Sequence, residues 1–568
     1  MGSGQPISAA HRASWSAPLD PERKVNQLLS RITFGPRPGD VERAREMGPG
    51  AFLDEQLHPE KLNDSAMEAR LSGLPTLSMS TGELMRKYPD PRRLQLQQAR
   101  MRMESGEPAS PAMMAPAMEA MSAPASETVQ EVLIELSREG LLRAVYSVRQ
   151  LQEVMVRFWM NHFNIFAGKG PDKWMLTSFE RDTIRPHALG RFEDLLVATA
   201  QSPAMLFYLD NWMSSKPISN QPSFPGRREA LGNGWRRFGG PFMPAGFRAG
   251  QNGPRFLNGP LAPNGQKRGL NENYGRELME LHTLGVDGGY TQQDVIELAR
   301  CLTGWTVRRP REEAEFFFDP RMHDEGLKTL LGHKIAAGGI EDGRQALHIL
   351  ATHPSTARFV SLKLCRRFVA DDPPGSVVER ASAEFSKSNG DVRAVLKAIL
   401  SSREFYSEGA YRAKVKSPFE LVVSTLRALG AETDAGRPLM WLMGRMGEPP
   451  FRYQAPAGYA DRGNTWISSS SLLGRLNFAL TIASNHIPGT RIDLESANSP
   501  ALMVEDLGRR LTGDDLSASS RQAILKSLRG LSSSPPPSDT APASEGKTFA
   551  TASTVAALVV GSPEFQKR

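Results

Sequence analysis

Residues 269–305 (GLNENYGRELMELHTLGVDGGYTQQDVIELARCLTGW) carry more side chains suited to chemistry than an ordinary solvent-facing helix does. Asn273, Glu277, Glu280 and His282 fall within about three turns of a predicted helix. Carboxylates and imidazoles can transfer protons or bind metal ions. The stretch therefore predicts a polar centre that either performs a reaction or braces the fold.

The helix in this stretch is predicted to begin after Asn271 and to stop at Gly285. Asparagine is favoured just before the first helical turn, and glycine favours the left-handed conformation that ends many helices. Asn273, Glu277 and Glu280 follow the spacing i, i+4, i+7, which places them on one face. The candidate catalytic residues are Asn273, Arg276, Glu277 and Glu280.

His282 does not share that face. At about 100° per residue, it lies about 140° around a straight helix from Glu277, too far for both to bind one small ion. Arg276, in contrast, lies one turn before Glu280 and can pair with it. A metal site would therefore need further ligands from other parts of the chain. The candidate metal ligands are His162, Glu277, Glu280, His323 and Asp324.

A set of histidines and carboxylates suits a divalent metal such as Zn, Fe or Mn, usually with one position left open for substrate or water. The alternative is a buried network in which Arg157, Arg276 and the histidines pair with the carboxylates, because buried charges must be compensated. His162 ends a predicted helix, where an imidazole can simply bond to carbonyl groups. Both interpretations remain open at the level of the sequence.

The bulk composition is that of a folded globular protein. The chain has 568 residues, of which 40% are apolar, and a net charge of +7 from 69 basic and 62 acidic residues. That excess is too small to predict nucleic acid as a partner. Cys301 and Cys365 both lie in helical patterns and are expected to be buried without a disulfide. No apolar run is long enough to span a membrane.

Hydrophobic periodicity predicts a mainly α protein, a large array of helices with one small β-hairpin near residues 315–335. Its strands are expected at Phe316–Phe318 and from Thr329 to Leu331. The predicted organisation is a flexible arm at 1–22, one helical domain at 23–568 (which could divide into 23–212 and 269–568), a disordered insertion at 104–126, a Gly/Pro/Arg-rich insertion at 213–268 and a Ser/Pro-rich loop at 531–546.

The insertion at 213–268 interleaves arginines with aromatic residues. Such a mixture suits contact with phosphates and bases, and a loop this long can also act as a lid. The alternative is a tethered surface insertion without a binding role. The amino terminus has no apolar signal core, so we expect a cytoplasmic protein, or a periplasmic or secreted one if an export signal has been trimmed.

Several segments together resemble one large bacterial family, the domain of unknown function 1800. They are LLSRITFGPRPGDVERA, FWMNHFNIF, GLNENYGRELMELHTLGVDGGYTQQDV, FDPRMHDEGLKTLLG, ARFVSLKLCRRFV and GYADRGNTWISSSSLLGRLNFA. The resemblance implies a predominantly helical fold and brings no settled activity. Members similar to this chain often carry export signals, which is absent here, and often sit beside a sulfatase-like protein in bacterial genomes.

Two functions follow as hypotheses. The first is a metal-dependent enzyme, hydrolytic or oxidative, built on the His/Glu polar centre. The second is a non-catalytic binding or assembly protein that works with a secreted sulfatase-like partner, because no GxSxG elbow, phosphate-binding loop or dinucleotide fingerprint is present.

Overall fold

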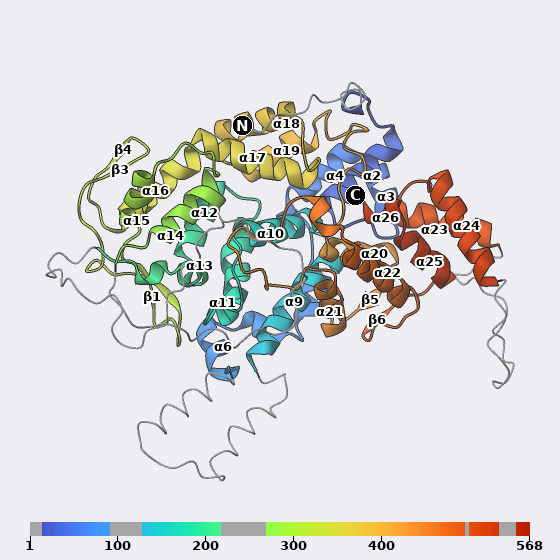
Figure 1. Cartoon of the computed structure of the whole chain (residues 1–568), viewed down its shortest axis with the longest axis horizontal. Helices are drawn as coiled ribbons and strands as arrows, with labels where there is room; N and C mark the ends of the chain where they lie inside the picture. The colour runs from blue at the N-terminus through green and yellow to red at the C-terminus, as the bar shows by residue number, and fades with distance from the viewer. Residues whose placement is uncertain (1–13, 91–127, 217–268, 495–498, 533–551) are drawn as a thin grey trace, which may run out of the picture.

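The computed structural model describes residues 14–90, 128–216, 269–494, 499–532 and 552–568, and these residues are mainly helical (Figure 1). The N-terminal helices are α2 (Pro21–Ile32), α3 (Asp40–Met47), α4 (Pro49–Gln56), α5 (Ser65–Leu71) and α6 (Thr81–Lys87). The middle of the chain contains α9 (Val129–Tyr146), α10 (Gln150–His162), α11 (Asp172–Ser178), α12 (Phe192–Gln201), α13 (Pro203–Tyr208), α14 (Glu272–Glu277) and α15 (Gln292–Cys301).

The remaining helices are α16 (Ile340–Thr352), α17 (Pro354–Phe368), α18 (Gly375–Lys387), α19 (Val392–Leu400), α20 (Pro418–Ala428), α21 (Arg437–Arg445), α22 (Ser469–Ala483), α23 (Pro500–Thr512), α24 (Ala518–Ser532), α25 (Ala552–Val560) and α26 (Pro563–Gln566). Two π-helical turns, η5 (Phe179–Ile184) and η8 (Leu278–Thr283), continue α11 and α14. The mainly α prediction is confirmed.

Short polar side chains set where many of these helices begin. The Asp20 carboxylate accepts from the backbone of Arg23 at the start of α2, and Ser80, Thr291 and Ser417 each form a reciprocal capping box. A capping residue satisfies backbone N–H groups that the helix itself leaves unpaired. These caps fix helix boundaries that hydrophobic periodicity alone would leave loose.

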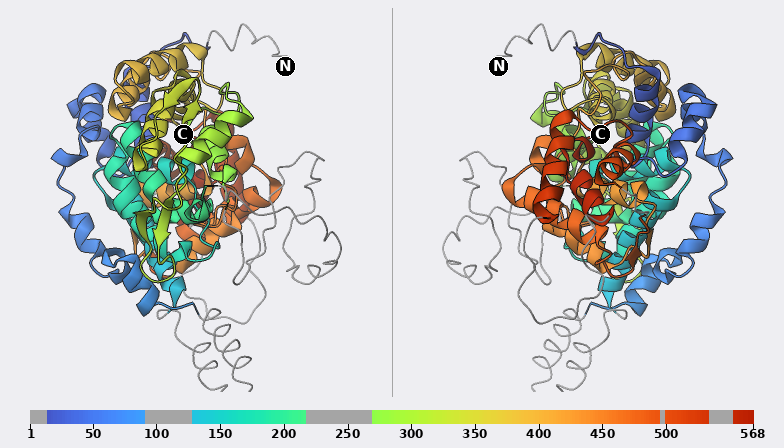
Figure 2. Two further views of the ribbon diagram at one scale, coloured as in Figure 1. Left: turned by 90° about the vertical axis from the view of Figure 1, so that its left-hand side faces the viewer. Right: turned by 90° about the vertical axis from the view of Figure 1, so that its right-hand side faces the viewer.

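Helix α10 lies in the middle of the molecule, with α9 and α11 beside it and α17 across it (Figure 1). Its Trp159 is fully buried and donates to the Ala188 carbonyl at 2.9 Å. The N-terminal helices run along one flank, outside the helices of the middle part (Figure 2). One continuous set of buried apolar side chains extends from Val25 to Phe565, so the two ends of the chain share the core.

The two expected strands exist, but they do not pair with each other. Strand β2 (Glu315–Phe318) pairs with β1 (Trp305–Arg308), and β3 (Lys328–Leu330) pairs with β4 (His333–Ile335). A third small sheet joins β5 (Glu432–Thr433) to β6 (Thr490–Arg491). The predicted hairpin was therefore wrong in its pairing. The polar turn between β2 and β3 is held instead by side-chain bonds to α15 and α16.

Other expectations meet only part of the described chain. Residues 14–20, expected within a flexible arm, contact the core, where Leu19 is buried and its N–H donates to the Tyr406 carbonyl at 2.9 Å. The insertion at 104–126 and nearly all of those at 213–268 and 531–546 lie outside the described residues. Cys301 and Cys365 are buried and free, as predicted. In the part described, no helix is long and apolar enough to cross a bilayer.

Candidate functional site

Helix α14 begins and ends where the sequence predicts. The Asn271 side chain accepts from the backbone N–H groups of Asn273 and Tyr274, and its amide donates to the Leu209 carbonyl at 2.8 Å. At the other end Gly285 takes φ +81°, which glycine adopts without strain. A Cβ at this position would meet the ring of Phe359 at 2.8 Å. The helix is thus fixed at both ends against neighbouring elements.

Between these ends the helix changes from α to π geometry at Leu278. The Thr283 hydroxyl donates back to the Leu278 carbonyl at 2.7 Å. A π turn inserts one residue into the ladder of hydrogen bonds, and such turns are frequent at functional sites. The angle of about 140° expected between Glu277 and His282 holds only for a straight α-helix. The two side chains nevertheless face different surroundings, since His282 is fully buried and Glu277 is half-buried.

Glu277 and Glu280 form a half-buried carboxyl pair. Burial, followed by the negative charge of Glu280, raises the pKa of Glu277 to about 7, although the Arg276 guanidinium opposes the shift. Arg276 donates to the side chain of Gln292 at 2.6 Å, and it forms no ion pair with Glu280. Burial and Glu280 also raise the pKa of Tyr290, whose hydroxyl interacts with the Glu280 carboxylate.

Two residues that the sequence did not single out belong to the same region. Burial raises the pKa of Tyr208 in α13, and the charges of Asp172 and Glu277 add to that shift. Asp172 in α11 is fully buried, both of its carboxyl oxygens lack a hydrogen-bond partner, and burial raises its pKa well above the ordinary value. In the sequence Asp172 follows Pro171 and looks like a simple helix-start acid, so no signal marked it.

His162 bonds to the backbone instead of a carboxylate. Its Nε2 lies 3.1 Å from the His282 carbonyl oxygen, and its ring packs edge-on against Phe163. Burial, then the charge of Lys363, lowers the pKa of His162 far below its usual range, and the same causes lower the pKa of His282 to about 3. Both imidazoles are therefore neutral at physiological pH, which agrees with the carbonyl-bonding interpretation of His162.

His323 is the centre of a buried network. Its Nδ1 lies 2.8 Å from the Thr303 carbonyl oxygen and its Nε2 lies 3.1 Å from Asp342. Asp342 also accepts from Lys328 at 2.5 Å, and all three ionisable side chains are almost completely buried. Both ring nitrogens of His323 are thus occupied by protein groups.

Asp324 is held separately, in a two-bond pair with Arg300 at 2.9 and 3.1 Å. Arg300 bonds in addition to Glu297. Across the described ranges, no group of three or more His, Cys, Asp or Glu side chains is arranged to hold a metal ion. The structure therefore does not bring the expected ligands together, because neighbouring elements engage them apart from one another. These ligands are His162, Glu277, Glu280, His323 and Asp324.

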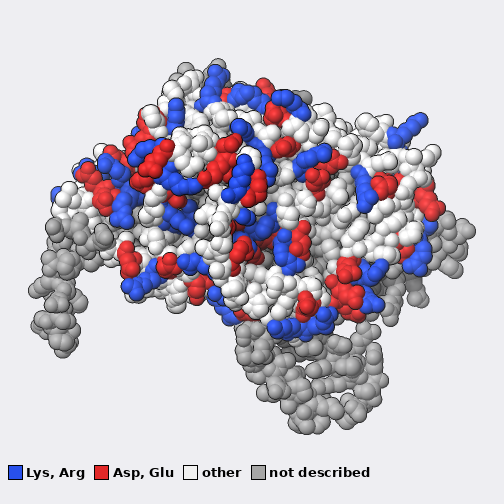
Figure 3. Space-filling model, turned by 180° about the vertical axis from the view of Figure 1, so that it is seen from behind, with Lys and Arg blue, Asp and Glu red and all other residues white. Residues whose placement is uncertain are grey.

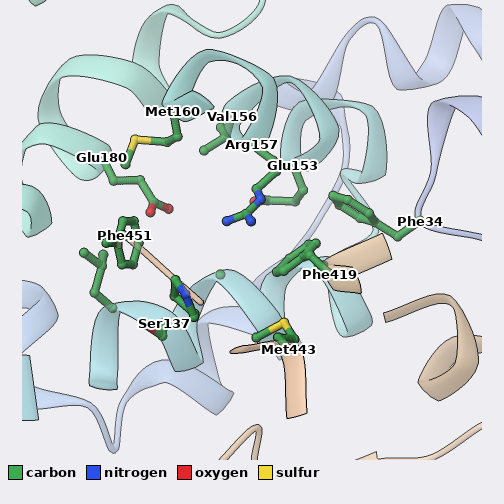
Figure 4. A pocket seen from close by; sticks show the side chains of 14 residues that line it. Phe34, Ser137, Glu153, Val156, Arg157, Met160, Glu180, Phe419, Met443 and Phe451 are labelled. Atoms are coloured by element: carbon green, nitrogen blue, oxygen red, sulfur yellow. The ribbon is translucent and has the colours of Figure 1, made fainter. Parts of the chain in front are cut away.

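A second carboxyl with a raised pKa lies inside the helical core. A cavity of about 40 Å³ is lined mostly by apolar side chains of α9, α10, α20 and α21, and Glu153, Glu180 and Arg157 turn toward it (Figure 4). Arg185 donates to Glu153 and to Glu180, each at 2.7 Å. Burial, followed by the charge of Glu139, raises the pKa of Glu180 to about 7. This site also sits on a π turn.

The segments that carry the sequence signature meet around α10. The Asn161 amide donates to the Tyr459 carbonyl at 2.9 Å and its oxygen accepts from the Tyr459 N–H at 2.7 Å. The amide of Asn164 donates to the Tyr453 and Ala455 carbonyls. Since His162 contacts η8 between these two asparagines, three signature segments share one short stretch of helix.

The pKa of Glu180 predicts how stability depends on pH. The folded state holds this proton more tightly than the unfolded state, so the Glu180 contribution is favourable below about pH 4.5 and is lost as pH rises to about 7. In Glu180→Gln this loss is absent. We expect the unfolding free energy of the variant, minus that of the wild type, to grow by up to about 1.4 kcal/mol per pH unit across this window. Urea unfolding at several pH values measures it, and a constant difference would contradict the assignment.

The buried Lys328–Asp342–His323 network predicts a large effect of charge removal. Asp342→Asn leaves the Lys328 ammonium buried without a carboxylate, so we expect a loss of about 3–5 kcal/mol in denaturant unfolding. Asp493→Asn is the control, because its ion pair with Arg491 is exposed and should contribute less than about 1 kcal/mol. Equal effects of the two substitutions would show that the buried network is not a stabilising centre.

Comparison with known proteins leads to one family. No curated protein and no solved structure gives a significant match to this chain. The family model described as a protein of unknown function, DUF1800, matches residues 27–567, which is nearly the whole chain. The chain with this carboxyl pair and this signature around α10 therefore belongs to the DUF1800 family.

Proposed function

We propose that this protein is an enzyme of hydrolytic type in which Glu277 transfers the proton. The observation that carries the proposal is a half-buried carboxyl that no described residue neutralises. Glu277 has no ion pair and no hydrogen bond among those residues, although Glu280 stands beside it. A structural carboxylate in such a place would normally be bonded to a cation or to backbone N–H groups.

A carboxyl whose pKa is about 7 suits acid–base chemistry. Near neutral pH it exists in both protonation states, so it can accept a proton from an attacking water and return it to a leaving group. Glu280, whose charge helps to hold this pKa up, acts as the electrostatic partner. Such a pair, in which one environment separates two carboxyls, is a common basis for assigning acid and base.

The metal-dependent form of the proposal rests on the same pair. Glu277 and Glu280 can supply two carboxylate ligands to Zn, Fe or Mn, but catalytic sites usually hold such a metal with three protein ligands. His323 would first have to leave Thr303 and Asp342. Metal analysis of the purified protein separates the two forms, because a bound catalytic metal should disappear in a Glu277→Gln, Glu280→Gln double variant.

The proton-transfer role predicts a selective loss of activity. On a panel of chromogenic carboxylic, phosphoric, sulfuric and glycosidic esters, Glu277→Gln is expected to lower kcat/KM by about 10²–10⁴ for any substrate that the wild type cleaves. Glu272→Gln, on the same helix and bonded to Gln292, is the control and should retain activity. The wild-type rate should change around pH 7. Unchanged cleavage by Glu277→Gln would exclude this role.

A second candidate function is supported by the surface of α22. Leu472, Leu473, Leu476 and Leu480 are 45–60% exposed on this helix, and Trp441 of α21 is 62% exposed. Apolar side chains gathered on one helix face are typical of a contact surface for another protein. This surface favours a binding or assembly role with a partner, for which a sulfatase-like protein is the proposed candidate.

The assembly role predicts that charge on α22 abolishes partner capture. Leu473→Glu combined with Leu476→Glu is expected to prevent co-purification with a co-expressed sulfatase-like protein, while circular dichroism and thermal unfolding stay close to those of the wild type. Leu327→Glu, at a leucine that is 78% exposed in the turn before β3, is the matched control. Capture that survives the double substitution would rule out this surface as the contact.

A further inference from the structure

A pocket with a cationic wall lies where α10, α17 and α20 approach the segment around Tyr459 and Trp466. It contains about 100 Å³ of space open to water, enough for several water-sized groups at roughly 10–15 Å³ each. Ser417 and Phe419, at the start of α20, contribute to the wall. The charged residues that line it are Arg157, Arg367, Lys414, Arg568, Glu420, Glu448 and Asp461.

The carboxylates of this pocket are already engaged. Glu420 accepts from both Arg367 and Arg568, the latter at 2.9 Å, and from the Ser417 N–H at 3.0 Å. Glu448 pairs with Arg157 at 2.7 Å and accepts from the Phe419 N–H at 2.8 Å.

The two remaining acids, just outside α17, are engaged as well. Asp371 takes the Lys414 ammonium and the Gly463 N–H, and Asp461 lies 3.3 Å from Lys363. Each acid therefore already compensates at least one neighbouring cation, and Glu420 is shared between two.

Three further buried cations surround the pocket without any carboxylate partner in the described chain. Arg31 is fully buried, donates only to the Ala410 carbonyl at 2.5 Å, and has two unpartnered donors, Nε and Nη1. The Lys416 ammonium lies 3.6 Å from the centre of the Phe565 ring.

Arg475 completes this group and bonds to neutral acceptors, at 2.7 Å to the Gln566 side chain and at 2.7 Å to the Lys416 carbonyl. Burial lowers the pKa of Arg31 to about 9, and Arg367 adds to the shift, so these cations crowd one another. The region thus buries more positive than negative charge.

Arg568 brings this unbalanced charge into the pocket itself. Its side chain is only 5% exposed, and it lines both this pocket and the neighbouring cavity of about 50 Å³. Its Nε and Nη1 atoms have no hydrogen-bond acceptor. A buried guanidinium with unused donors is costly unless an acceptor reaches it.

We propose that this pocket binds a small oxyanion of the phosphate or sulfate type, either free or as the terminal group of an ester. Arginine donors match the oxygens of such groups, and the N-terminal end of a helix such as α20 favours negative charge. Arg568 and Arg367 line one side and Lys414 another, so the anion compensates the surplus that Glu420 leaves. The inference is independent of the reaction proposed for Glu277.

Calorimetric titration of the full chain tests the proposal. The probes are inorganic phosphate, inorganic sulfate and glycerol phosphate, with acetate and chloride as comparison anions at constant ionic strength. We expect saturable binding of at least one oxyanion with one site per chain, and glycerol phosphate distinguishes a free ion from an ester group. Absence of saturable oxyanion binding, or equal binding of acetate or chloride, overturns the proposal.

A charge placed at the mouth of the pocket gives the sharpest variant. Ala460 is exposed and lines the pocket, so substitution there removes no buried contact. Ala460→Glu is expected to weaken oxyanion binding about fivefold or more, since two charges about 4 Å apart interact by about 1 kcal/mol even in water. Ala460→Gln, of the same size but neutral, should bind like the wild type. Equal affinities of the two variants contradict the proposal.

Arg568→Gln tests the buried donor directly. Its oxyanion affinity is expected to fall about tenfold or more, because a charged hydrogen bond is lost. Arg427→Gln is the control, because Arg427 is equally buried but bonds to Gly35, Val145 and Asp40 away from the pocket. Glu277→Gln should also bind normally, which separates this inference from the catalytic proposal. If Arg568→Gln does not fold, the Ala460 pair decides the outcome.

Discussion

The reciprocal hydrogen bonds between Asn161 and the main chain of Tyr459 fix the irregular segment that the rest of the centre depends on. They hold this segment against α10, where Gly458 comes so close that a Cβ would lie 2.2 Å from the Asn161 carbonyl oxygen. Once fixed, the segment supplies the Gln454 carbonyl that accepts from the Tyr208 hydroxyl at 2.7 Å. One asparagine therefore positions both the wall of the cationic pocket and a neighbour of Glu277.

Buried charge is the second feature that shapes this molecule. The core encloses Glu180 with Arg185 on one side of α10 and Arg31 with its cationic neighbours on another. On the outer face seen in Figure 3, basic and acidic side chains are interspersed, so the imbalance is an internal property. Because a low-dielectric interior magnifies each unpaired charge, the few groups left without partners, such as Glu277 and Arg568, are where a ligand or proton has most effect.

How much could be read from the sequence differs between elements. The helix from Asn271 to Gly285 follows from its cap, its periodicity and its terminal glycine, and the polar face at Glu277 follows from the same spacing. The π turn at Leu278 could not be predicted, because it depends on packing against other helices. The role of His323 was equally hidden, since Asp342 is 19 residues away in another helix. For the same reason the strands near residues 315–335 were placed correctly but paired incorrectly.

Helix α17 connects the histidine pair to the cationic pocket. Lys363 and Arg367 are one turn apart, so their side chains leave the same face of this helix. The charge of Lys363 lowers the pKa of both His162 and His282, and its ammonium lies 3.3 Å from Asp461 at the pocket. An anion beside Arg367 would compete with Asp461 for that local positive charge. The signature segments therefore meet in one electrostatic unit, in which the occupancy of the pocket is felt by the buried imidazoles packed on η8.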